Sequence, residues 1–254
     1  MLTIREEQLR VFRDDARERF VCRLTDHFVA LYPRECRQAG GPAGIRKVVE
    51  RALKGAVSHI YETEEQASLY IALAFMLGCD FDRDPQLPWV RDWIDDRDAF
   101  PDTSSRIRQL YDYATDYLGD TAGENCSHLV RALIRIQQWS PADAPPGEGP
   151  EWRTGMCSLL GMLYPQKLQY QGEQATSEML EWASVRCGMH GIRGSSGRAI
   201  YGILAFMLGC GFDHDPGHPW AEQALAMSGA SEQDRVRCLY DAAMQHVSTS
   251  LEAD

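Results

Sequence analysis

The chain has 254 residues, of which 44% are hydrophobic and 25% charged, as is typical of a globular protein with an apolar core. Its formal net charge of −11 argues against nucleic acid or an anionic membrane as a partner. The longest apolar run, residues 69–77, is shorter than the about 20 residues that cross a bilayer, and the charged start lacks the apolar stretch of a secretory signal. We therefore expect a soluble, cytoplasmic protein whose eight cysteines are buried apolar residues rather than disulfides.

Helical patterns fill the first half of the chain. The first helix is predicted to begin at a capping box, Thr3 to Glu6, and to end before Pro33. It carries a single apolar stripe with steps of three or four residues: Leu9, Phe12, Ala16, Phe20, Leu24, Phe28 and Leu31. Three more helices are expected in this half, at about 43–59, 63–77 and 107–118. The helix that contains 69–77 is apolar on every side there, which indicates a central helix covered by its neighbours.

One motif occurs twice in the sequence. The segment Leu73 to Trp89 (LAFMLGCDFDRDPQLPW) returns as Leu204 to Trp220 (LAFMLGCGFDHDPGHPW) without a gap. Shorter matches surround it: Leu31-Tyr32-Pro33 with Leu163-Tyr164-Pro165, His59 with His190, Tyr70 with Tyr201, and 106–112 with 235–241. Self-similarity of this kind indicates two related units, which we divide as 1–120 and 121–254. The prediction is an all-α protein of two pseudo-symmetric helical units that arose by internal duplication.

The second half repeats the helical pattern with one interruption. Its stretch 140–150 (SPADAPPGEGP) is too rich in Pro and Gly for a helix, so we expect a loop that breaks the first helix of this unit. Later helices are marked by Met179 to Ala183, by Tyr201 to Leu208 and by Val236 to Val247. No sustained period-two run occurs in the chain, and strands are not expected.

The repeated motif is predicted to stop one helix and start the next. Gly78 can end the central helix in the left-handed conformation, and Asp84-Pro85 and Leu87-Pro88 are typical of helix starts with Asp as the cap. Phe81 and Trp89 are expected to fill the corner between the two helices. This interpretation treats the motif as structural.

Two metal-site interpretations of the motif are weaker. Asp80, Asp82 and Asp84 begin like a calcium loop, but Pro85 stands where glycine is needed and Arg91 where a bidentate Glu is needed. His214 and His218 lie beside Asp213 and Asp215, but Pro216 and Gly217 break any helix between the two histidines. The first copy has Arg83 and Leu87 in their place, so we expect a solvated loop there. No metal site and no cofactor are predicted.

Motifs of catalysis are missing from the sequence. It has no nucleophile elbow, no phosphate-binding or dinucleotide-binding glycine loop and no zinc-protease helix. Cys187 and His190, which could suggest a nucleophile and a base, are expected at the end of a helix. We predict a protein that is not an enzyme and has no catalytic residues.

The segment Leu73 to Trp89, with Arg-x-x-x-Leu-Tyr in the last helix, resembles small bacterial helical proteins encoded in type VI secretion clusters. The opening Thr3 to Gln8 and the segment Gly44-Ile-Arg are similar too. The resemblance covers most of the first copy, but only the core motif and last helix of the second; the tandem arrangement is a departure. It implies an accessory role, in which the protein keeps an effector soluble or loads it on the secretion spike.

We therefore expect a non-enzymatic adaptor or chaperone that binds a secreted effector or toxin, or a spike component. Paired helical units offer a face or cleft for proteins, and aromatic residues can anchor an interface. The candidate partner-binding residues are Asp82, Asp84, Trp89, Trp93, Asp213, Asp215 and Trp220. The first alternative is an immunity protein whose acidic surface blocks a basic toxin site. The second is an enzyme or small-ligand binder that uses the cleft between the units.

Overall fold

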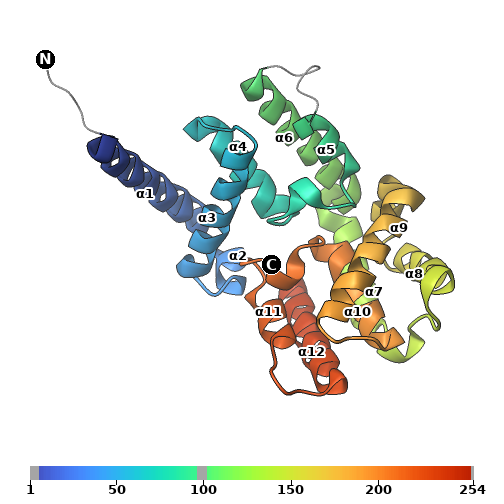
Figure 1. Cartoon of the computed structure of the whole chain (residues 1–254). Coiled ribbons are helices and arrows are strands. Elements are labelled where there is room, and N and C mark those ends of the chain that lie inside the picture. The colour runs from blue at the N-terminus through green and yellow to red at the C-terminus, as the bar shows by residue number, and fades with distance from the viewer. Residues whose placement is uncertain (1–5, 96–101, 253–254) are drawn as a thin grey trace, which may run out of the picture.

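The computed structural model describes residues 6–95 and 102–252, and within these ranges all regular structure is helical (Figure 1). The all-α prediction is therefore confirmed for this part of the chain. Thr3 of the expected capping box lies outside the described residues. The helices of the N-terminal half are α1 (Glu6–Leu31), α2 (Pro33–Gln38), α3 (Pro42–Ser58), α4 (Glu64–Leu77), α5 (Pro88–Asp95) and α6 (Thr103–Ala122). Those of the C-terminal half are α7 (Ser127–Gln138), α8 (Gly149–Leu163), α9 (Pro165–Met189), α10 (Ser195–Leu208), α11 (Pro219–Leu225) and α12 (Glu232–Leu251).

Helix α4 is the centre of the N-terminal half, as its apolar sequence predicts. It packs between α3 and α6, and Ile71 and Leu73 are fully buried there. Thr63 caps the start of α4, because its hydroxyl accepts the amide of Gln66 while the Gln66 side chain accepts the amide of Thr63. The Gln66 amide nitrogen also donates to Thr103 at the start of α6, which fixes the two helix starts side by side.

Helix α10 has the same place in the C-terminal half. It packs against α9, and Ala205 and Phe206 are fully buried. The first helix of this half is interrupted as predicted: α7 ends at Gln138 and α8 begins at Gly149, with a short 3₁₀ turn, η3 (Pro141–Asp143), between them. Each half has its own buried cluster of apolar side chains. The division expected after residue 120 falls inside the last turn of α6, which ends before Gly123.

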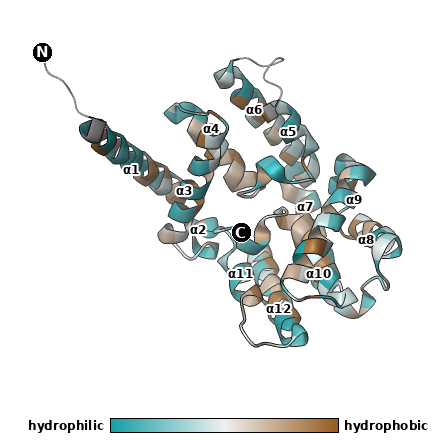
Figure 2. Cartoon of the chain, viewed as in Figure 1, coloured by the Kyte–Doolittle hydropathy of each residue, from teal (hydrophilic) through white to brown (hydrophobic). Residues whose placement is uncertain are grey.

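Helix α1 extends away from the rest of the fold at its N-terminal end (Figure 1). Only its C-terminal part is covered, and burial begins at Phe20 and Val21. Upstream of them, Val11 and Phe12 are each 63% exposed, and apolar residues lie among hydrophilic ones along this helix (Figure 2). The single stripe expected along the helix therefore has a buried part and a part that the described residues leave exposed.

Among the described residues, no helix has the length and apolar character needed to span a bilayer.

Candidate protein-binding site

The two copies of the repeated motif end their helices in the same unusual backbone conformation. Gly78 ends α4 with φ 101° and ψ 152°, and Gly209 ends α10 with φ 91° and ψ 156°. The prediction that Gly78 stops the helix is confirmed. The conformation differs from the expected left-handed cap, because ψ is extended, in a region that only glycine occupies readily. The chain then forms a 3₁₀ turn in each half, η1 (Phe81–Arg83) and η4 (Phe212–His214).

This conformation directs the next amide of each copy to a carboxylate of the other copy. The backbone amide of Cys79 donates to Oδ2 of Asp215 at 2.9 Å. The backbone amide of Cys210 donates to Oδ2 of Asp84 at 2.8 Å. The two bonds are reciprocal, and both are buried. Hydrogen bonds to a buried carboxylate are stronger than those between neutral groups, so this pair fastens the two halves together.

Asp84 was expected to cap the following helix, and the structure gives it another role. Helix α5 begins later, at Pro88. Oδ1 of Asp84 accepts the amide of Gln86, and Oδ2 is used by Cys210 of the other half. Asp215 repeats this arrangement, because its Oδ1 accepts the amide of Gly217 at 2.7 Å.

A second connection between the halves is ionic. Nε2 of His214 lies 2.7 Å from Oδ2 of Asp80, and its Nδ1 contacts Asp213. Arg51 donates to Oδ1 of Asp80 at 2.6 Å and to the carbonyl oxygen of His214 at 2.8 Å. His214 therefore lies between carboxylates of both halves, and the expectation of a solvated loop is wrong for it.

These contacts shift the pKa values of the groups involved. Hydrogen bonds to Asp213 and Asp80 raise the pKa of His214 to about 9. Burial acts to raise the pKa of Asp80, but the hydrogen bonds of His214 and Arg51 outweigh it and lower the pKa to about 2. At neutral pH the histidine is thus held as a cation between two anions.

The four aspartates proposed for partner binding are engaged inside this chain. Asp84 and Asp215 make the reciprocal bonds described above, and Asp213 accepts the hydroxyl of Tyr201 at 2.7 Å while its side chain is fully buried. Asp82 lies 2.8 Å from Nε2 of His59. The structure therefore gives these carboxylates a structural role, since at least one oxygen of each is bonded to a donor of the chain.

The three tryptophans proposed as anchors are partly buried. Trp89 packs against Tyr113, with ring centroids 4.8 Å apart, and Trp220 packs against His246 at 5.4 Å. Trp93 packs on the core of the N-terminal half. The motif as a whole thus forms the junction of the two halves, and none of the seven proposed residues, Trp93 beyond the motif included, stands out as an open contact surface.

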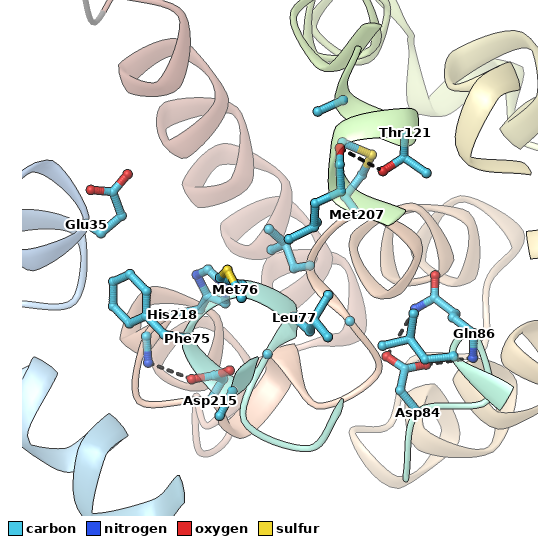
Figure 3. A pocket seen from close by; sticks show the side chains of 18 of the residues that line it. Glu35, Phe75, Met76, Leu77, Asp84, Gln86, Thr121, Met207, Asp215 and His218 are labelled. Atoms are coloured by element: carbon cyan, nitrogen blue, oxygen red, sulfur yellow. Dashed lines mark hydrogen bonds between the residues drawn. The ribbon is translucent and has the colours of Figure 1, made fainter. Parts of the chain in front are cut away.

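A cavity of about 400 Å³ lies at this junction. Figure 3 shows Asp84 and Gln86 on one side, Asp215 and His218 on the other, and Leu77 between them. Lys167 also lines it; burial lowers the pKa of this amine to about 8, and its Nζ donates to the carbonyl oxygen of Phe206. The two carboxylates that line the cavity, Asp84 and Asp215, already accept backbone amides of the opposite half. We therefore assign the cavity to the junction of the two halves.

A groove on the N-terminal half is more open. It runs between α1 and α4, has a volume of about 670 Å³, and is bounded by α6 through Tyr111. Apolar side chains form its floor: Phe20, Leu24, Phe28, Leu31, Leu69 and Ala72. Ion pairs lie at its edge, Arg23 with Glu64 at 2.8 Å and Arg108 with Glu65.

The matching residues of the C-terminal half are buried. By the alignment of Leu31-Tyr32 with Leu163-Tyr164, the groove residues correspond to Trp152, Met156, Leu160, Leu163, Ile200 and Ile203, all of them in the core. Leu31 is 56% exposed and Tyr32 38%, whereas Leu163 and Tyr164 are 5% and 4% exposed. The difference between the halves is therefore the cover and not the apolar character of the floor.

Helix α7 and the turn η3 supply the cover in the C-terminal half. Ala132 and Ile136 of α7 are buried in the same core as the floor residues. The carbonyl oxygen of Pro141 accepts the hydroxyl of Ser196 at 2.9 Å, and the turn packs against α10. Gly155 makes room for this segment, because a Cβ there would lie 2.6 Å from Cβ of Pro145. Arg23 stands at the matching position of the N-terminal half.

One feature of the sequence indicates this groove, although the site residues were predicted from the repeated motif. The interruption at 140–150 has no counterpart in the first half, where α1 continues as one helix. A cover is thus present in the C-terminal half, and residues 6–95 and 102–122 provide none over the matching groove of the N-terminal half. That difference identifies the groove between α1 and α4 as the candidate protein-binding site.

No group of three or more His, Cys, Asp or Glu side chains in residues 6–95 and 102–252 is arranged to hold a metal ion. Compared with known protein families, with curated proteins and with solved structures, the chain shows no significant match.

Proposed function

We propose that this protein is a non-enzymatic accessory protein that binds another protein through the groove between α1 and α4. In this proposal it consists of two pseudo-symmetric units of an internal duplication, one closed and one open. The resemblance of its repeated motif to proteins of type VI secretion clusters suggests a secreted effector as the partner, with the protein as its adaptor or chaperone.

The observation that carries the proposal is the exposure of Leu31 and Tyr32 where Leu163 and Tyr164 are buried. Covering apolar surface stabilises a protein by about 25 cal/mol per Å², so an apolar floor without cover favours association. The rim of Arg23, Glu64, Glu65 and Arg108 gives the groove a polar edge, as is common around protein interfaces.

The test is reconstitution with purified components. Tagged protein is isolated from its native host, and a secreted protein that co-purifies with it is expressed separately. The two purified proteins are then mixed, and light scattering measures the molar mass of the complex. A stable complex of defined stoichiometry supports the proposal. Recovery of the chain alone with a bound metabolite would count against it and favour a ligand-binding role.

An activity assay then separates the adaptor from the immunity protein. If the partner is a toxin, an adaptor leaves its activity largely intact once bound, whereas an immunity protein abolishes it at equimolar concentration. The acidic charge of −11 is compatible with both, so the assay is needed to choose between them.

A further inference from the structure

The cover of the C-terminal half shows what kind of segment fits such a groove. Helix α7 is amphipathic: Ala132 and Ile136 are buried, and Leu129 and Leu133 are partly buried against the same core. These four residues follow the spacing i, i+3, i+4, i+7, which places them on one face of a helix. The covering unit is therefore a helix of about three turns.

The groove of the N-terminal half offers a matching floor. Leu24 and Phe28 of α1 stand where Met156 and Leu160 lie under the cover, and Ala72 stands where Ile203 lies. Ala72 is smaller than Ile203, so this groove is deeper at that point and can take a larger side chain from an incoming helix.

The polar edge differs between the halves, and this limits the occupant. Arg23 stands at the position of Gly155, where a Cβ would lie 2.6 Å from Cβ of Pro145, so the N-terminal half has no room for a turn on the path of Pro145. Glu65 replaces Ser196, and an ionised carboxylate cannot donate to a carbonyl oxygen as that serine does. A helix alone, without the turn after α7, fits these substitutions.

We propose that the groove between α1 and α4 binds an amphipathic α-helix of a partner protein, with apolar residues at i, i+3, i+4 and i+7 in the manner of α7. This inference rests on the proposed function and specifies the form of its partner. Recognition of a helix through one apolar face is a recurrent way for a groove to bind a protein segment.

The probe is a fluorescein-labelled peptide of residues 127–140 of this chain, measured by fluorescence anisotropy against the full-length protein. We expect saturable binding. Ala72→Glu should weaken it about tenfold or more, because it places a charge on the apolar floor. Leu31→Asp, at an exposed position that does not endanger folding, should weaken it as well. Val185→Glu on α9, also at an exposed site, is the matched control and should bind as the wild type does.

Three outcomes would overturn the inference. One is no binding of the peptide, and another is equal binding to the wild type and both groove variants, which would place the peptide elsewhere. The third is a wild-type dimer in sedimentation that becomes monomeric with Phe12→Asp and binds the peptide only then. That result would make the exposed part of α1 from a second copy the occupant.

The same variants separate this inference from the proposed function. If the reconstituted complex with the partner protein survives Ala72→Glu and Leu31→Asp, the accessory role stands, but the groove is neither the partner-binding site nor a helix-binding site. If the peptide binds the groove but no partner protein forms a complex, the groove stands and the accessory function fails.

Discussion

Oδ2 of Asp84 accepts a hydrogen bond at 2.8 Å from the backbone amide of Cys210, a residue 126 positions away in the chain. The copy of this contact, from the Cys79 amide to Asp215, makes the junction of the two halves self-complementary. Paired contacts of this kind are usual where two identical subunits meet about a two-fold axis. Here they occur within one chain, so neither half needs a second molecule to satisfy its corner amide.

Asp84→Asn and Asp215→Asn should each lower the free energy of unfolding by about 1 to 3 kcal/mol. Both oxygens of each aspartate accept a backbone amide, so an asparagine must turn its NH₂ group toward one of these N–H donors. Urea unfolding of each variant measures the loss. Asp241→Asn, at an exposed position, serves as the control and should leave stability unchanged.

Gly78→Ala should destabilise the fold by about 1 to 3 kcal/mol, because φ of 101° with ψ of 152° is closed to residues with a Cβ. The added Cβ would also lie 3.2 Å from the carbonyl oxygen of Leu208 across the junction. The comparison is Gly119→Ala within α6, where a Cβ meets nothing within 4 Å. That change should raise stability by about 0.5 to 1 kcal/mol. Equal melting temperatures for both variants would contradict the helix-stop role of Gly78.

Stability should fall as pH rises from about 6.5 to 9, through His214. Its pKa in the folded protein, raised to about 9 by Asp213 and Asp80, lies above its ordinary value of 6.5. The folded state therefore holds the proton more tightly, and this stabilisation is complete below pH 6.5 and lost toward pH 9. Because about a third of the side chain is exposed, we expect on the order of 1 kcal/mol.

The variant His214→Gln isolates this effect. Urea unfolding gives the free energy of unfolding of the wild type and of the variant at pH 6 and at pH 9. Subtracting the variant's value from the wild-type value at each pH removes the contribution of the other titrating groups, which both proteins share. The wild type should lose its advantage over the variant at pH 9. A constant advantage at both pH values would show that His214 does not carry the proton between Asp80 and Asp213.

Gly155→Ala should destabilise the C-terminal half by about 1 to 3 kcal/mol through a steric conflict. The new Cβ would lie 2.6 Å from Cβ of Pro145, and the proline ring cannot rotate away. Gly188→Ala on α9 is the control, because a Cβ there meets nothing within 4 Å. Hydrogen exchange should locate the loosened segment at 141–147. Unchanged protection there would argue against close packing of this cover.

Part of the fold could be predicted from local patterns. Proline and glycine positions marked the ends of α1 and α4, Thr63 with Gln66 marked a capped start, and the Pro-rich stretch 140–150 marked the break between α7 and α8. These features act within a few residues of the chain, so the sequence contains them directly.

The candidate site was harder to predict, because it depends on what covers a helix. The apolar stripe of α1 has the same spacing at Phe12 as at Phe28, yet Phe12 is 63% exposed and Phe28 6%. Likewise, the aspartates of the motif have the composition of a surface site, and only the packing of the two copies shows their oxygens bonded to Cys79 and Cys210.

The sequence by itself determined the helical class, the ends of α1 and α4, the break between α7 and α8 and the existence of a repeated corner, since periodicity, caps and breakers are local properties. Tertiary structure alone decided that the two corners bind each other, that His214 lies between Asp80 and Asp213, and that one groove is covered and the other open. These outcomes depend on contacts between residues far apart in the chain. Local sequence preferences do not specify which distant carboxylate accepts a given amide, or whether a helix packs over its neighbour.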